Sequence, residues 1–422
     1  MYHHIAKELL AFLDASPTCF HAVKNMKEML LSQGFTPLSE REKWDLSPGG
    51  RYFVTRNDSA IIAFSIPKDG IRGFRIMASH SDSPTFKIKE NPEVCVEDHY
   101  TQLNVERYGG MTYGPWLDRP LSVAGRVVVK EGEQFITKLV NIDRDLVLIP
   151  NMAIHINKEL NNGYKYNPQK DLLPVYGDIS AKGTFMKTVA EAAGVSEENI
   201  LGHDLFLYNR QKGTVWGAGE EYISSGRLDD LQCAFASLKG FLKGKREKYA
   251  AVHCVFDNEE VGSGTKQGAG STFLKDTLTR IAENLSMSRQ DYLMALAESF
   301  MVSADNAHAV HPNHTEKADP TNRPYINCGI VIKYNADQKY CTDAVSAAMF
   351  KDLCIRAGAA FQTYTNRSDQ PGGSTLGNIS TVQLALNAVD IGLPQLAMHS
   401  PYETAGVRDT ADLIKAAALL FE

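Results

Sequence analysis

Three acidic residues crowd together directly after a short apolar run in the second half of the chain. Asp257, Glu259 and Glu260 follow the segment YAAVHCVF at 249–256. Neighbouring carboxylates repel one another, and a cation held close to them removes that cost. The cluster therefore indicates either an acidic turn in contact with solvent or a site that holds a cation.

Four other segments place an imidazole or a carboxylate where an apolar run ends or a helical pattern begins. These residues are His80 after FRIMAS, Asp229 in SGRLDDL, Asp305 after FMVSA and His399 after LPQLAM. In open α/β sheets, ligands bind outside the carboxyl ends of the strands. We therefore expect these four side chains to converge with Glu260 on one site.

Imidazole and carboxylate ligands without a thiolate favour Zn²⁺, or a neighbour such as Mn²⁺ or Co²⁺, in a catalytic site with an open position. Five side chains supply two ions only if one carboxylate bridges them, and Asp229 is the best candidate. A metal pair acidifies the water between the ions and polarises a carbonyl oxygen. Glu260 is then expected as a ligand and Glu259 as the free carboxylate that faces the water. Asp82 is expected to accept the second N–H of His80.

Each of these signals also fits an ordinary structural role. A histidine at a strand end is usually hydrogen-bonded within the fold, and RLDDL is typical of a helix start where acids complement the helix dipole. The segment GSGTKQGAG at 262–270 lacks the GxxxxGK[ST] pattern of a phosphate loop. His308, His311 and His314 favour a polar loop over a third zinc site. The position that the five predicted ligands share is what favours a metal centre.

Strand-like and helical segments alternate along most of the chain. Short apolar runs at 249–256 and 325–334 suit strands covered on both faces, and helical patterns include 225–244, 343–358 and 409–422. This alternation predicts an α/β layered domain. Residues 91–223 differ, with a hairpin pattern around Glu131-Gly132 and one clear helix, FMKTVAEAAG. We therefore expect a catalytic domain of residues 1–90 plus 224–422, interrupted by an inserted domain at 91–223.

Composition excludes several classes of protein. The chain has 422 residues, enough for two domains, and a net charge of −6, which argues against a general nucleic-acid surface. No apolar stretch approaches the roughly 20 residues that span a bilayer, and the first residues do not resemble a secretory signal. The seven cysteines are scattered without a CxxC pair, which is typical of reduced thiols. These features predict a cytoplasmic protein that binds neither membranes nor nucleic acid.

Five spaced motifs occur in the order seen in the aspartyl aminopeptidase family, which the chain resembles over essentially its full length. They are SHSDSP (79–84), RLDDL (227–231), DNEEVGS (257–263), SADNAHAVHPN (303–313) and LAMHS (396–400). The resemblance implies a zinc-exopeptidase-like three-layer α/β/α sandwich with an inserted, mainly β dimerisation domain. It also implies two metal-ligand sets that share one carboxylate: His80, Asp229 and Asp305 for one ion, and Asp229, Glu260 and His399 for the other.

The same resemblance implies further functional positions. His155, in IPNMAIHINKELN, would reach the active site of a neighbouring subunit. Lys333 and Tyr340, in IKYNADQKY, would lie near the substrate, and Gly373 and Ser374, in GGSTLGNIS, would form a substrate-facing turn. Family members form tetrahedral shells of twelve subunits, so dimers and a dodecamer are implied.

The predicted activity is therefore metal-dependent removal of N-terminal residues, acidic ones by the family name, from short peptides with a free amino group. Glu259 would take a proton from the water that bridges the metals and pass it to the leaving amine. His155 would help to stabilise the oxyanion, and Lys333 would pair with an acidic side chain or a backbone carboxyl group. Two alternatives stay open: a dinuclear-zinc deacylase of N-acyl amino acids, and a non-catalytic shell-forming protein that binds metal.

Overall fold

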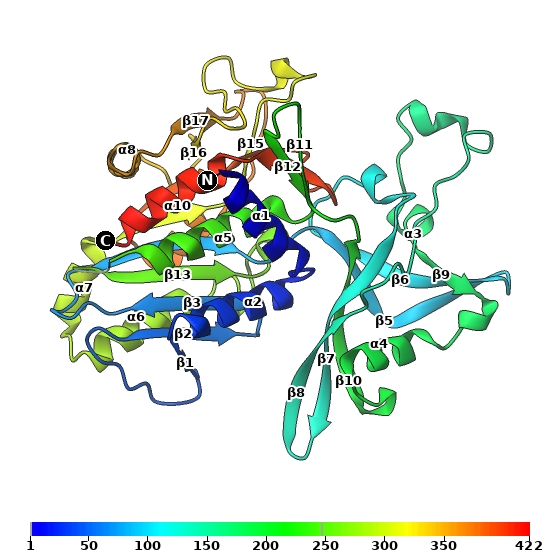
Figure 1. Cartoon of the computed structure of the whole chain (residues 1–422), viewed down its shortest axis with the longest axis horizontal. Helices are drawn as coiled ribbons and strands as arrows, with labels where there is room; N and C mark the ends of the chain where they lie inside the picture. Colours follow the sequence, from blue (N-terminus) through cyan, green and yellow to red (C-terminus); the bar gives the residue numbers. More distant parts are fainter. Residues whose placement is uncertain (1, 246–247) are drawn as a thin grey trace. The chain divides into compact units, whose positions relative to one another are not determined.

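A computed structural model describes residues 2–245 and 248–422. The contacts within the chain divide it into two compact units, both of which are drawn in Figure 1. The first unit comprises Met1–Asp82, Gly213–Met398 and Glu403–Glu422, and the second comprises Ser83–Lys212 and His399–Tyr402. The chain therefore leaves the first unit, builds the second and returns.

The first unit is built on a nine-stranded mixed sheet. In spatial order its strands are β1 (Thr36–Leu38), β2 (Arg51–Arg56), β3 (Ala60–Ser65), β13 (Ala250–Phe256), β4 (Phe74–His80), β14 (Phe300–Ala304), β18 (Asn387–Gly392), β16 (Ile330–Tyr334) and β17 (Phe361–Thr365). The central strands β3, β13 and β14 are buried along their whole length. Such strands have no solvent face, which explains their continuous apolar runs.

Helices cover both faces of this sheet. One core cluster joins the sheet to α1 (Tyr2–Asp14), α2 (Cys19–Ser32), α5 (Leu228–Lys243), α8 (Ala344–Ala357) and α10 (Asp409–Leu420), of which α5 and α10 run side by side (Figure 1). A second cluster joins it to α6 (Phe273–Asn284), α7 (Arg289–Ala297) and α9 (Leu376–Gln383). Strand β13 supplies Ala251 and Val255 to the first cluster and Val252 and Cys254 to the second, because successive side chains point to opposite faces. The predicted three-layer α/β/α sandwich is confirmed.

A smaller sheet completes the first unit. Its strands, in spatial order, are β11 (Thr214–Trp216), β12 (Tyr222–Ser225), β20 (Glu403–Gly406), β19 (Pro394–Leu396) and β15 (Ala307–His308). Strand β15 begins two residues after Asp305, and β20 begins with Glu403, so this sheet holds segments next to the predicted ligands.

The second unit is mainly β, as the sequence predicts for the insert. Its six-stranded antiparallel sheet has the order β8 (Gln134–Asn141), β7 (Leu121–Glu131), β10 (Ile200–Asn209), β5 (Thr85–Val96), β6 (Tyr100–Tyr108) and β9 (Val175–Asp178), and its α-helices are α3 (Pro168–Asp171) and α4 (Phe185–Ala193). The predicted hairpin at Glu131-Gly132 joins β7 to β8, and Gly132 has the positive φ of +61° that this tight turn requires. The unit has its own core, which includes Phe86, Trp116 and Phe185.

The limits of the two units differ from the predicted domain limits at 90/91 and 223/224. Strand β5 begins at Thr85, and its residues 85–88 already pair with β6 in the second unit. Strand β11 pairs with β12, which pairs in turn with β20, and this places residues 214–223 in the first unit. Pairing of β5 with β10 and of β12 with β20, each distant in sequence, decides the unit to which these residues belong. None of the helices in the described ranges is long and apolar enough to cross a membrane.

Candidate metal centre

The predicted ligands of the first unit follow strands whose carboxyl ends lie at one edge of the large sheet. Strand β4 pairs in parallel with β13, with Phe256 opposite His80, and also pairs in parallel with β14. His80 is the last residue of β4, Asp305 directly follows β14, and Glu260 lies in a 3₁₀ turn (Glu259–Val261) shortly after β13. Parallel pairing therefore brings these residues together although they are far apart in sequence.

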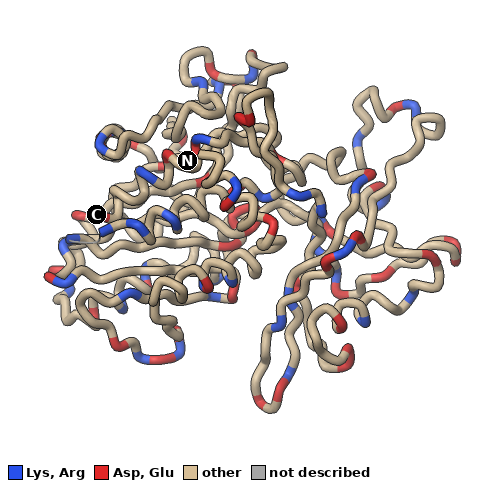
Figure 2. Tube along the Cα trace, viewed as in Figure 1, with Lys and Arg blue, Asp and Glu red and all other residues tan. Residues whose placement is uncertain are grey.

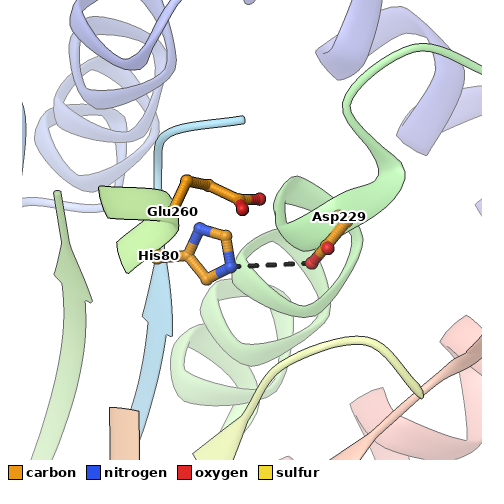
Figure 3. A group of neighbouring side chains, drawn as sticks. All are labelled: His80, Asp229 and Glu260. Atoms are coloured by element: carbon orange, nitrogen blue, oxygen red, sulfur yellow. Dashed lines mark ion pairs between the residues drawn. The ribbon is translucent and has the colours of Figure 1, made fainter. Parts of the chain in front are cut away.

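Three of the predicted ligands form a group with metal-binding geometry. The ligand atoms of His80, Asp229 and Glu260 all lie within 4.8 Å of one another, and Figure 3 shows the three side chains pointing toward one another from β4, the start of α5 and the 3₁₀ turn. A second group joins Asp229 to Asp230 and Asp305 within the same limit. Asp229 belongs to both groups, which is the position that a bridging carboxylate would occupy.

The His80 ring is oriented by the loop that follows it. Its Nδ1 atom lies 3.0 Å from the backbone oxygen of Asp82 and 3.3 Å from the carboxylate of the same residue. A proton on Nδ1 would be donated there, which leaves the lone pair on Nε2. Nε2 is buried and makes no hydrogen bond within the described residues, and it lies 3.5 Å from Asp229 and 3.7 Å from Asp305. An imidazole nitrogen aimed into a group of carboxylates fits a metal ion.

Asp82 does more than the sequence predicts. Besides contacting His80, its two carboxylate oxygens accept hydrogen bonds from the backbone N–H groups of Glu259 (3.1 Å) and Glu260 (3.2 Å). The turn that carries both glutamates is flanked by left-handed residues, Asn258 with φ +60° and Gly262 with φ +96°. One carboxylate therefore fixes the imidazole and the glutamate pair in a common frame.

The acids of the site share an unfavourable environment for negative charge. Burial, reinforced by Asp305 and other neighbouring carboxylates, raises the pKa of Glu259 to about 8. Burial and Asp229 raise the pKa of Glu260 well above its usual range, and burial does the same for Asp230. For His80, burial favours the neutral ring, but Asp229, Asp305 and Asp82 outweigh it and raise the pKa well above the ordinary value. Without a cation these groups share protons, and a metal ion would replace them.

Two further residues, which the sequence analysis did not identify, hydrogen-bond to the backbone of the predicted ligands. Asp230 is fully buried, and its Oδ2 atom accepts the backbone N–H of His80 at 3.1 Å. Glu403 accepts the backbone N–H of Asp229 at 3.1 Å. The doubled acid in LDDL was a visible signal for Asp230, whereas nothing near Glu403 in the sequence indicates this contact.

Lys333 and Tyr340, predicted near the substrate, lie next to Asp305. Lys333 is only 3% exposed; its ammonium group donates to the backbone oxygen of Asn306 at 2.8 Å and lies 3.9 Å from the carboxylate of Asp305. Burial disfavours its charge, but Asp305 outweighs burial and raises the pKa of Lys333. The same ammonium group lies 5.5 Å from the ring centre of Tyr340, which is also buried.

Three buried side-chain amides are hydrogen-bonded to one another next to Lys333. The side-chain amide of Asn306 donates to Gln232 (3.1 Å) and to Gln395 (2.9 Å), and Gln395 contacts Glu403 at 3.5 Å. These hydrogen bonds connect the segment after β14 to α5 and to the smaller sheet. The segments that these hydrogen bonds connect are next to Asp305 and Asp229. The sequence did not indicate these hydrogen bonds, because the partners are distant in the chain.

The other predicted site residues are not members of either ligand group found among the described residues. Gly373 and Ser374 lie in an exposed loop before α9, where the Ser374 hydroxyl donates to Asn378. His155 is exposed in the second unit. His399 is grouped with the second unit, has a positive φ of +67°, and its backbone oxygen accepts a hydrogen bond from Thr112. The predicted roles of these four residues stay predictions.

Comparison with known proteins reveals similarity over nearly the whole chain. A family described as aminopeptidase I zinc metalloprotease (M18) matches residues 12–421. A relative from Clostridium acetobutylicum, named probable M18 family aminopeptidase 2, is 48% identical over 412 residues, covering 96% of this chain and 95% of the relative. A relative of the same name from Ectopseudomonas mendocina is 38% identical and covers 98% and 97%.

Solved structures are similar over the same extent. The Ape4 chain in a cryo-EM structure of the Ape4 and Nbr1 complex superimposes with a TM-score of 0.96 at 35% identity, covering 100% of this chain and 86% of that one. The structure of an S. cerevisiae mApe1 dodecamer gives 0.87 at 27% identity, with 100% and 97% coverage. An M18 aminopeptidase from Thermotoga maritima gives 0.87 at 24% identity, with 100% and 96% coverage, and shows the same fold.

Proposed function

The chain belongs to the M18 family of zinc-dependent aminopeptidases and is a metalloaminopeptidase, and we propose that it removes Asp or Glu from the free N-termini of short peptides. The observation that carries the metal-dependent hydrolysis in this proposal is the convergence of His80, Asp229 and Glu260, with Asp305 joined to them through Asp229. Those residues are an imidazole and three carboxylates, the ligand types that zinc takes in hydrolytic sites.

The ligand set that we propose holds two divalent ions. His80, Asp229 and Asp305 would bind one, and Asp229, Glu260 and His399 the other, with Asp229 as the bridge. Zinc is the metal of the family, and Mn²⁺ or Co²⁺ would accept the same ligands. When bound, the ions polarise the scissile carbonyl group and make water more acidic.

Glu259 is the residue that we propose to move the proton. It takes a proton from the attacking water and delivers it to the nitrogen of the leaving peptide, acting first as base and then as acid. Its place outside both ligand groups of the described residues supports this role, as does the hydrogen bond that holds its backbone to Asp82. Its neighbour Glu260 is in a ligand group, so we propose that Glu260 binds metal and Glu259 transfers the proton.

Substrate selection would depend on two charged parts of the substrate, its free amino group and an acidic group. A carboxylate of the site would bind the free amino group, which restricts cleavage to the first peptide bond. We propose that Lys333, whose charge Asp305 stabilises, pairs with an acidic side chain or backbone carboxyl group of the substrate, beside Tyr340. The exposed turn with Gly373 and Ser374 would contact the substrate backbone.

Assembly is part of the proposal because His155 would act in a neighbouring subunit and help to stabilise the oxyanion. The residues beside it are apolar and exposed: Met152, Ile154 and Ile156, of which Ile156 is 80% exposed. Exposed apolar residues in a row are typical of an interface. The mApe1 relative is a dodecamer, which supports dimerisation through the second unit and a tetrahedral twelve-subunit shell for this chain.

A panel of fluorogenic aminoacyl substrates tests the proposed activity. Zinc-loaded protein is assayed with Asp, Glu, Leu, Lys and Ala derivatives, and the assay is repeated after chelation and after adding back Zn²⁺, Mn²⁺ or Co²⁺. We expect the highest kcat/KM for Asp or Glu, loss on chelation and recovery with metal. A preference for Leu or Lys would contradict the acidic specificity.

The same assay separates the aminopeptidase from the deacylase. Peptides with an N-acetyl group lack the free amine that the proposed mechanism requires, so we expect them to resist cleavage. Cleavage of N-acetyl-aspartate in preference to aspartyl peptides would overturn the proposal in favour of the deacylase. Inactivity toward both classes with metal bound would favour the non-catalytic alternative.

A further inference from the structure

A basic pocket lies at the amino-terminal edge of β4 and β13, the edge of the large sheet opposite to His80. It is formed where β2 begins, where β3 ends and where the chain leads into β4 and β13, and the residues that define it are Arg51, Ser65, Lys68, Arg72, Lys245 and Lys248. Arg51 pairs with Ser65, which pairs in turn with Ala251, so these strand ends are neighbours. The length of β4 separates the basic pocket from His80 by about 20 Å. It is therefore distinct from the candidate metal centre.

The charge of the basic pocket is opposite to that of the protein as a whole. Among the residues that the structure describes, five exposed cationic side chains line it together with one carboxylate, Asp69, although the chain carries a net charge of −6. Arg72 is paired with Glu298 at 2.9 Å and Lys245 more loosely with Glu422 at 3.7 Å. Arg51, Lys68 and Lys248 make no ion pair within the described residues. A concave surface lined by charges of one sign focuses their electric field and attracts ions of the opposite sign, so the gathering of these cations favours an anionic ligand. Figure 2 shows Lys and Arg segments close to the C-terminus, at this end of the sheet.

A buried hydroxyl group adds a directional contact. Ser65 is 2% exposed and lines the basic pocket, and its Oγ atom has no hydrogen-bond partner among the described residues. Burying a hydroxyl group without a hydrogen-bond partner is unfavourable, and a ligand oxygen that accepts a hydrogen bond from it would remove this cost. The pocket thus offers a buried hydroxyl group in addition to its exposed cationic side chains.

We propose that the basic pocket binds a small anion that carries two or more phosphate groups. Guanidinium groups match phosphate oxygens in pairs, lysines act as point charges, and a serine hydroxyl donates to a phosphate oxygen. The cavity volume of about 1080 Å³ exceeds what one inorganic phosphate fills and suits a metabolite-sized ligand. A small phosphorylated anion satisfies the several separated charges better than a single carboxylate does.

Inorganic pyrophosphate is the probe for the first experiment, measured by calorimetry on the zinc-loaded full-length protein. The double variant Lys68→Gln/Lys248→Gln removes two unpaired charges, and we expect it to weaken binding at least about tenfold. Ser65→Ala keeps the charge and should weaken binding about threefold or more. Aspartyl-substrate hydrolysis without pyrophosphate should be unchanged in both variants, which shows that they are folded.

Controls separate the basic pocket from other ways of binding the probe. Pyrophosphate also chelates zinc, and that signal would be the same in wild-type protein and in every variant. Lys130→Gln/Lys187→Gln removes two exposed lysines from the second unit and should bind pyrophosphate as the wild type does. Citrate, with a charge similar to that of pyrophosphate, and a glutamate hexapeptide, with a larger negative charge, report on binding of carboxylate ligands.

Three outcomes would overturn the proposal. One is the absence of any saturable binding up to about 10 mM pyrophosphate, a concentration beyond metabolite affinities. Another is equal binding by wild-type protein and the Lys68→Gln/Lys248→Gln variant. The third is tighter binding of citrate or of the glutamate hexapeptide, which would assign the pocket to carboxylates or to acidic peptides.

Discussion

Glu259 is the side chain whose proposed role has the most direct consequence for catalysis. In Glu259→Gln the amide cannot take a proton from water, but the proposed ligands His80, Asp229 and Glu260 are retained. We expect kcat to fall by about 10²–10⁴-fold while the protein binds as much zinc as the wild type. Steady-state kinetics and metal analysis of the purified variant check the two expectations together.

The matched control for this variant is Glu283→Gln, which makes the same chemical change at an exposed position of α6. It should leave kcat and zinc content unchanged. If Glu259→Gln keeps full turnover, another group moves the proton. If it loses zinc, Glu259 contributes to metal binding.

The raised pKa values of the buried acids couple metal binding to protons. At neutral pH the metal-free site is partly protonated, because the pKa of Glu259 is about 8 and those of Glu260 and Asp230 are also raised. Metal ions displace these protons, so we expect release of at least about one proton per site at pH 7. Apparent zinc affinity should therefore rise as the pH is increased toward 8. Calorimetry in buffers of different ionisation enthalpy measures the number of protons.

The same shifts predict the opposite trend for stability of the metal-free protein. A carboxyl group with a raised pKa binds its proton more tightly when folded, so ionisation disfavours the folded state. Stability of the metal-free protein should fall as the pH rises from the ordinary carboxyl range toward 8, and zinc should suppress this loss. A metal-free melting temperature that rises over this range would contradict the assignment.

At the scale of secondary structure, the last residue of β18 is a glycine that packs closely against the backbone of Asp305. Gly392 packs against the segment after β14, and a Cβ atom there would lie 2.0 Å from the backbone oxygen of Asp305. Gly392→Ala should push Asp305 out of position. We expect a loss of about 1–3 kcal/mol in unfolding free energy and weaker zinc binding. Thermal unfolding and zinc titration measure the two effects.

Gly202→Ala in β10 is the matched control for this change. The same added methyl group meets no atom within 4 Å there, so stability and zinc affinity should stay close to those of the wild type. Equal effects of the two substitutions would show that close packing at Gly392 does not position Asp305.

At the scale of the whole molecule, subunits that share active sites can be identified by complementation. Co-expression of Glu259→Gln and His155→Ala chains yields mixed oligomers if the protein assembles as proposed. Some sites then combine an intact Glu259 with an intact His155 from the other chain. About one site in four should regain activity in randomly mixed oligomers, because each site draws the two residues from different subunits.

The two variants assembled separately and then combined are the control for this experiment, and they should stay inactive as long as subunits do not exchange. Mixed oligomers without recovered activity would place His155 in the same subunit as its site, or outside catalysis. A particle no larger than one 46.6 kDa chain by native mass spectrometry would contradict assembly altogether.

The sequence predicted the sandwich well because its elements depend on local patterns. Buried strands such as β13 have uninterrupted apolar sequences, and α8 is followed by Gly358, whose φ of +60° suits glycine. The order of strands in the sheet, and the limits of the inserted unit at Ser83 and Lys212, could not be predicted in this way. Hydrogen bonding between strands that are distant in sequence determines the strand order and the unit limits. The sequence of one strand does not indicate which strand it pairs with.

For the site, residue type and position at strand ends were enough to identify His80, Asp229, Glu260 and Asp305 as candidates. Only the tertiary structure decided how they are held: by Asp82, whose carboxylate joins the imidazole to the glutamate turn, and by Asp230 and Glu403 on the backbone of the ligands. The physical reason is that a metal-binding residue must carry a particular chemical group, and the residue type given by the sequence identifies that group. Its orientation and its pKa depend on burial and on neighbours, which exist only once the chain has folded.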